Sequence, residues 1–262
     1  MPRFETPTAI SLELDLVVAD VRIDAGDRAD TVVDVRPGDP SKRDDVAAAE
    51  RTQIEHTPGR LLVRTPKSWR TYSLFGHGGA VQVHIELPTG SRVTAKSGMG
   101  SIRSSGELGE SQVKTGMGDI QIERAASARL TTGMGDVEVG RVAGPAELST
   151  GTGDIRAGEL HGHVVLKNTN GDVRVAEAVR GSVEARTGYG QIEVGIADGT
   201  AAWLDLRTGY GQVHNRLDRS GPPDPGEESV DVRAHSGYGD IAINRAPKRD
   251  LTTESRDDTT GD

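Results

Sequence analysis

A six-residue phrase that recurs eight times constrains the fold of this chain more than any other feature. Each copy opens on Ser, Thr or Asn and ends on a polar and then an aliphatic residue, and in seven copies two glycines bracket one variable residue. The copies begin at Ser97, Thr115, Thr132, Thr150, Asn168, Thr187, Thr208 and Ser236. Successive starts lie 18, 17, 18, 18, 19, 21 and 28 residues apart. A period of about 18 residues predicts a solenoid, because one such repeat cannot bury its apolar side without stacking on its neighbours.

The fold class we predict is all-β: a single elongated β-solenoid of stacked coils, each with two short strands around the glycine turn. The last position of the phrase is always Ile or Val, and we expect this row to form the core. Its members are Ile102, Ile120, Val137, Ile155, Val173, Ile192, Val213 and Ile241. A charge in this row should unfold the coil, because it would bury an unpaired ion.

The variable position between the glycines forms a second row. It reads Met99, Met117, Met134, Thr152, Asn170, Tyr189, Tyr210 and Tyr238. Like residues stack about 4.8 Å apart in such a coil, so the row predicts a packing ladder of neighbouring side chains. The alternative is an exposed apolar and aromatic strip that binds a glycan or a protein partner.

Five copies carry Asp after the second glycine, and this third row has two interpretations. Its members are Asp119, Asp136, Asp154, Asp172 and Asp240. Asp in a turn accepts hydrogen bonds from nearby backbone amides, and we expect the Thr at the start of the phrase to assist. The alternative is a calcium-binding module like the β-roll, although the β-roll repeat is half as long and its Asp stands one residue further from the glycine.

Composition excludes several classes of protein. The net charge of −9 argues against nucleic acid and anionic membrane surfaces. The chain has no Cys and no apolar run long enough to span a bilayer, and residues 1–6 do not resemble an export signal. We therefore expect a cytoplasmic protein without membrane insertion. The hydrophobic content of 34% suits the thin core of a solenoid.

The chain divides into three parts. Residues 1–90 form a strand-rich segment that we expect to continue the solenoid, residues 91–245 hold the repeats, and residues 246–262 form a polar tail that we expect to be disordered. Period-two alternation predicts strands within 8–36 and at 53–56, 61–64 and 81–87. Residues 37–52 break the alternation and predict a loop with a short helix capped at Asp39 or Ser41.

The residues most suited to recognition are aromatic. A glycine-rich loop holds three of the eight aromatic residues, Trp69, Tyr72 and Phe75, and we expect it either to bind a partner or to cover an open edge of the solenoid. With Tyr189, Tyr210 and Tyr238, these residues form the candidate interaction surface. The sequence has no nucleophile elbow, phosphate-binding loop or zinc-protease motif, so we assign no catalytic, cofactor or metal residues.

The phrase from Val83 to Gly90, followed by the recurring Thr-Gly-x-Gly-Asp-Ile, resembles the bacterial putative-adhesin family of domains of unknown function. The resemblance covers about residues 8–245. It implies a β-solenoid and an adhesin-like role, and the family has no established catalytic residues.

The function predicted from the sequence is that of a non-enzymatic interaction or scaffold protein. Its partner would be an unidentified protein, a glycan or another copy of the chain, and no cofactor is predicted. One alternative is a carbohydrate-active β-helix enzyme, which would need a groove with at least two carboxylates and a basic residue. The other is the calcium-dependent module.

Overall fold

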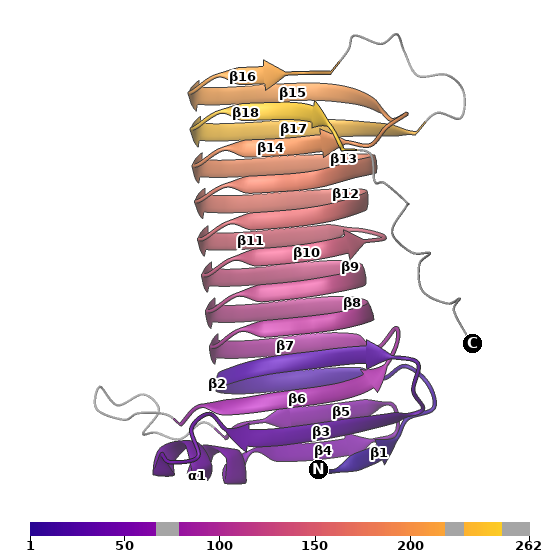
Figure 1. Cartoon of the computed structure of the whole chain (residues 1–262), viewed down its shortest axis with the longest axis vertical. Helices are drawn as coiled ribbons and strands as arrows, with labels where there is room; N and C mark the ends of the chain where they lie inside the picture. Colours follow the sequence, from indigo (N-terminus) through magenta and orange to yellow (C-terminus); the bar gives the residue numbers. More distant parts are fainter. Residues whose placement is uncertain (67–78, 218–227, 248–262) are drawn as a thin grey trace, which may run out of the picture.

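The computed structural model describes residues 1–66, 79–217 and 228–247. The described strands belong to one 18-stranded sheet that coils upon itself into an elongated, solenoid-like stack (Figure 1). Before the repeats lie β1 (Arg3–Glu5), β2 (Ser11–Gly26), β3 (Asp30–Pro37), α1 (Arg43–Arg51), β4 (Gln53–Thr57), β5 (Arg60–Arg64) and β6 (Val81–Pro88). The repeats form β7 (Arg92–Met99), β8 (Ile102–Met117), β9 (Ile120–Met134), β10 (Val137–Val142), β11 (Ala146–Thr152), β12 (Ile155–Asn170), β13 (Val173–Tyr189), β14 (Ile192–Ile196), β15 (Ala201–Tyr210), β16 (Val213–Asn215), β17 (Ser229–Tyr238) and β18 (Ile241–Arg245).

Neighbouring repeats pair in parallel with the copies of the phrase in register. Val137, for example, lies between Ile120 of one neighbour and Ile155 of the other. Several strands are longer than the sequence predicted: β8, β9, β12 and β13 each run from one glycine corner to the next. Within β8 and β12 a register shift, at Ser104/Glu107 and at Leu160/His161, marks an irregularity where the strand continues instead of ending.

The aliphatic row forms the core with one exception. Seven of its eight side chains are at most 1% exposed, but Val213 is 44% exposed. The prediction that all eight are buried was therefore wrong for Val213. The physical reason is its position: β16 pairs only with β18, so no further coil covers this side chain among the described residues.

The last repeat does not lie at the end of the stack. β17 pairs with β13 on one side and with β15 on the other, and β18 lies in the same way between β14 and β16. The chain therefore leaves a one-coil gap after β14, forms the terminal coil of β15 and β16, and then fills the gap (Figure 1).

In the N-terminal segment, too, the order of the strands in space differs from their order in the chain. β2 lies between β5 and β6 on one side and β7 and β8 on the other, all in parallel. Beyond them β1, β3 and β4 pair antiparallel with their neighbours instead of in parallel. These strands and α1 occupy the N-terminal end of the molecule (Figure 1).

The helix lies in the predicted segment but begins later than the predicted caps. Its N-cap is Lys42, which makes no side-chain capping bond. The Asp39 carboxylate instead accepts hydrogen bonds from the amide and hydroxyl of Ser41. The carboxylate of the buried Asp45 accepts hydrogen bonds from the backbone amides of Asp39 and Ala80. It therefore attaches the helix to the start of β6.

Two polar ladders join the corners of successive coils. The Thr132 hydroxyl donates to the carbonyl of Gly118 at 3.0 Å, and the amide of Asp136 donates to Asp119 Oδ1 at 3.0 Å. The prediction that Asp accepts backbone amides is confirmed, but the amide belongs to the adjacent coil rather than to the same turn. An amide thus lies between successive carboxylates and offsets their repulsion.

Candidate functional site

The predicted aromatic surface is only partly within the described residues. Trp69, Tyr72 and Phe75 lie outside them. The other three rings stack in the order Tyr189, Tyr238 and Tyr210, with centroids 4.9 and 4.8 Å apart and planes 6° apart. All three are exposed. The row is therefore both a packing ladder and an exposed strip.

The stacking limits what this strip can bind. Rings that face one another turn their edges and hydroxyl groups to solvent, whereas a sugar packs against the face of a ring. Among the described residues, the free face of this stack belongs to Tyr210 at its end, a residue that is 70% exposed. The strip is better suited to hydrogen bonding at its flank and to stacking at its end than to binding a sugar chain along its length.

A larger feature, which the sequence did not predict, is a groove of about 740 Å³ on the outer face of the sheet near the N-terminal end. We call it the polar groove. Its polar lining residues are Asp20, Arg22, Asp24, Asp34, Arg36, Gln82, His84, Arg103, Ser104, Ser105, Gln121, Glu123 and Glu138. They come from six strands, β2, β3, β6, β8, β9 and β10, which are widely separated in the chain.

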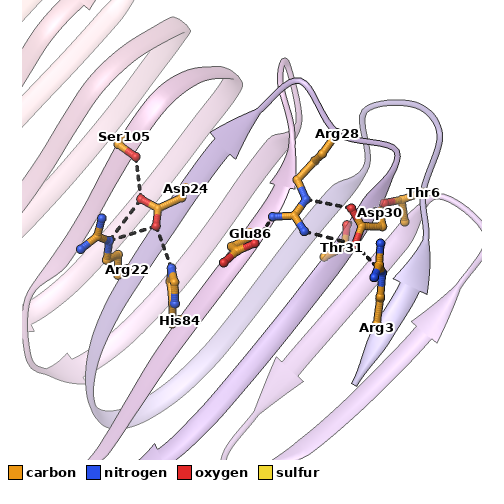
Figure 2. Close-up of polar contacts among 10 residues, drawn as sticks. All are labelled: Arg3, Thr6, Arg22, Asp24, Arg28, Asp30, Thr31, His84, Glu86 and Ser105. Carbon is orange, nitrogen blue, oxygen red and sulfur yellow. Dashed lines mark hydrogen bonds and ion pairs between the residues drawn. The ribbon is translucent and has the colours of Figure 1, made fainter. Parts of the chain in front are cut away.

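Asp24 is the centre of a hydrogen-bonded cluster in the polar groove (Figure 2). His84 Nε2 lies 2.7 Å from one carboxylate oxygen, and the Ser105 hydroxyl donates to the other at 2.6 Å. Arg22 Nε donates to both oxygens, at 3.0 and 3.2 Å. The cluster joins β6, β2 and β8, so it exists only because β2 is placed between two strands that follow it in sequence.

The pKa of Asp24 is lowered despite partial burial. Burial acts to raise this pKa, but hydrogen bonds from Ser105, His84 and Arg22 together outweigh it. The carboxylate is therefore ionised at neutral pH and holds three side chains in fixed positions. This arrangement presents preorganised donors and acceptors to a ligand in the groove.

A second cluster beside the groove is structural. Arg28 pairs with Asp30 at 3.0 Å and also with Glu86, and Arg3 pairs with Asp30 at 2.7 Å (Figure 2). Next to Asp30 in the chain, the buried hydroxyl of Thr31 forms a hydrogen bond with that of Thr6 at 2.8 Å. These contacts attach β1 and β3 to β6.

No motif in the sequence distinguishes the residues of the polar groove from the other outward-facing residues of the coils. Outward side chains alternate along every coil, and those of the groove are no different in type from those elsewhere. This stretch of the outer face becomes a site because β6 lies next to β2 and β3 lies next to β6.

The Asp row does not gather into a metal site. Within the described ranges, no group of three or more His, Asp or Glu side chains is arranged to hold a metal ion. One oxygen of each Asp that follows the second glycine in the four coils from Asp119 to Asp172 accepts the amide of the next coil. These hydrogen bonds support the structural interpretation of the row.

No helix among the described residues is both long and apolar enough to cross a membrane.

One solved structure shares this fold at low identity, and two others align over most of the chain. A putative adhesin from Bacteroides fragilis aligns over 92% of this chain and 95% of its own, with a TM-score of 0.53 and 14% identity, which shows a common fold. A putative cell adhesion protein from Clostridium sporogenes aligns over 93% and 98%, with a TM-score of 0.30 and 11% identity. A putative lipid binding protein from Parabacteroides distasonis aligns over 94% and 96%, with a TM-score of 0.34 and 12% identity. The last two likenesses support no conclusion.

No curated protein matches the chain. The model of the Toastrack DUF4097 domain, a domain of unknown function, matches residues 9–244. The match covers all eight repeat phrases and the strands β2 to β6, and the chain belongs to the Toastrack DUF4097 family.

Proposed function

We propose that the chain is a non-enzymatic, adhesin-like binding module, and that the polar groove takes an extended glycan. The observation that carries the proposal is the Asp24 cluster at the centre of a groove of about 740 Å³. Binding sites gain affinity when their polar groups are already held in the bound arrangement. The fold shared with a putative adhesin supports a binding role in general and identifies no ligand.

The lining favours a neutral glycan. It offers donors from Arg22, Arg103 and Gln121 beside acceptors from Glu123 and Glu138, which suits hydroxyl groups that both donate and accept. The polar lining carries five carboxylates against three guanidinium groups, so an acidic sugar would be repelled.

The test is binding of the whole chain to an array of neutral, amino and acidic oligosaccharides, followed by titration calorimetry. We expect a neutral oligosaccharide to bind. Ser105→Phe should fill the groove, and Gln121→Ala should remove an exposed donor without touching the core; each should weaken binding at least about tenfold, the effect of about 1.4 kcal/mol.

A matched control is Ser149→Phe, which places the same ring on β11, outside the polar groove. It should leave the affinity unchanged. Binding that survives both groove variants, or that Ser149→Phe weakens equally, would assign the ligand to another surface.

A second candidate function is a carbohydrate-active enzyme, because the polar groove contains the carboxylates and basic residues that such an enzyme requires. A glycoside hydrolase also needs one carboxyl group that stays protonated near neutral pH. The lowered pKa of Asp24 makes it unsuitable as that acid. Release of new reducing ends from a bound oligosaccharide, lost in Glu138→Gln, would favour the enzyme over the binding module.

A further inference from the structure

The two ends of the stack differ in how their edges are covered. At the N-terminal end the outermost strands are β1 and β4, of three and five residues, which run antiparallel to their neighbours. At the other end β15 is ten residues long and, within the described part of the chain, pairs with β17 alone. Among the described residues, one edge of β15 therefore presents unpaired backbone groups.

The terminal coil, formed by β15 and β16, also exposes more apolar side chains than the other coils of the described stack. Trp203 is 64% exposed, Tyr210 70% and Val213 44%, and Leu204 and Leu206 are half-buried. Monomeric proteins protect long edge strands from pairing with other chains by means of Lys, Pro or β-bulges. β15 contains neither Lys nor Pro, and its two charged residues, Asp205 and Arg207, pair with each other at 3.0 Å. Such an edge is suited to pairing with another strand.

The backbone directions define how a partner strand would approach. The amide of Ala201 donates toward the β17 side, to Glu228, and residues along a parallel strand alternate between its two neighbours. The backbone groups of Ala202, Leu204, Leu206 and Thr208 therefore face the open edge. Stacking the terminal coil on the N-terminal end of another copy would set this strand against the short β1 and β4, so it fits poorly there.

We propose that the terminal coil pairs with the terminal coil of a second copy, β15 against β15, antiparallel about a two-fold axis at Leu206. In this register Leu204 lies opposite Thr208 of the partner subunit in a hydrogen-bonded pair. Asp205 lies opposite Arg207 of the partner subunit in a non-hydrogen-bonded pair, where side chains are closest. Shifting the axis to Asp205 would place the two Asp205 carboxylates opposite each other, which is unfavourable.

The dimer adds a property that the single chain lacks and does not depend on the proposed function. The two polar grooves would lie near the far ends of one rod, so a multivalent surface could engage both at once. Dimer formation and groove binding can fail independently, because one is measured as mass and the other as ligand affinity.

The test is the mass in solution, measured by light scattering after size exclusion over a wide concentration series. We expect twice the 27.7 kDa of one chain. Arg207→Glu puts a carboxylate opposite Asp205 of the partner subunit and should give monomer, and Asp205→Arg should do the same by opposing two guanidinium groups. The double variant Asp205→Arg/Arg207→Glu restores opposite charges across the axis and should restore the dimer.

The matched control is Arg186→Glu on β13, which breaks a similar surface pair with Glu184 two coils from the end. It should remain dimeric, and far-ultraviolet circular dichroism should show all variants folded. Monomer at every concentration overturns the proposal and leaves the terminal coil to a different partner. A dimer that persists in both single variants also overturns it, because the contact must then lie elsewhere.

Discussion

At the scale of single residues, Asp136 stabilises the stack through an ionised carboxylate. The pKa of Asp136 is lowered, first by the hydrogen bond from the amide of Asp154 and then, against opposing burial, by Arg156. A carboxylate whose folded pKa lies below its unfolded value of 3.8 adds stability above that pH. This stability is lost as the pH falls through the folded pKa.

Asp136→Asn should therefore lower the melting temperature most at neutral pH, and the gap to the unsubstituted chain should close below about pH 4. Thermal melts monitored by circular dichroism across this range measure the effect. Arg156→Gln removes the ion pair but keeps the amide bond, so most of the gap should persist in that background. A gap that is the same at pH 7 and pH 3 would contradict a role for the charge.

The aliphatic row contains a matched pair of valines that separates burial from residue type. Val137 is fully buried and Val213 is 44% exposed. Val137→Ala should cost about 2 kcal/mol of unfolding free energy, from lost burial and a residual cavity. Val213→Ala should cost less than about 0.5 kcal/mol. Urea unfolding at low protein concentration measures both, and equal costs would show that the terminal coil is covered in the single chain.

At the scale of strands and corners, each coil turns where glycine has a backbone conformation that other residues avoid. Of the two glycines in the phrase, only the second has positive φ, as at Gly118 with φ 132°. The first is required for close approach instead: a Cβ on Gly116 would lie 2.6 Å from the carbonyl oxygen of Gly98. The phrase combines two different physical requirements.

Gly118→Ala should be severely destabilising, by at least about 3 kcal/mol, because strain adds to overlap with the adjacent coil. A Cβ there would lie 2.2 Å from the carbonyl oxygen of Gly100. Gly59→Ala is the control, since its φ is 76° but a Cβ would meet nothing within 4 Å. It should cost about 1–2 kcal/mol, from strain alone. Similar losses in urea unfolding would refute close packing of the corners.

At the scale of the whole molecule, the order of coils in space differs from their order in the chain at both ends. β2 lies between strands that follow it in the chain. β17 and β18 lie between the coil of β13 and β14 and the terminal coil of β15 and β16. The first exchange assembles the Asp24 cluster, and the second leaves β15 and Val213 at the open end. Both proposed functional surfaces, the polar groove and the terminal coil, result from these exchanges rather than from the repeat itself.

The sequence alone determined the repeating unit, the parallel stack in register and seven of the eight core side chains, because each depends on a short pattern that every coil carries. It also indicated that Asp and Thr bond backbone groups, and that Tyr189, Tyr210 and Tyr238 lie in one row. Only the tertiary structure decided that Tyr238 lies between the other two, that the N-terminal strands turn antiparallel, and that Arg22, Asp24, His84 and Ser105 meet in a groove. The physical reason is that the repeated phrase determines how a coil packs against any neighbouring coil of the same kind. Which coil becomes that neighbour depends on contacts between parts of the chain that are far apart in sequence.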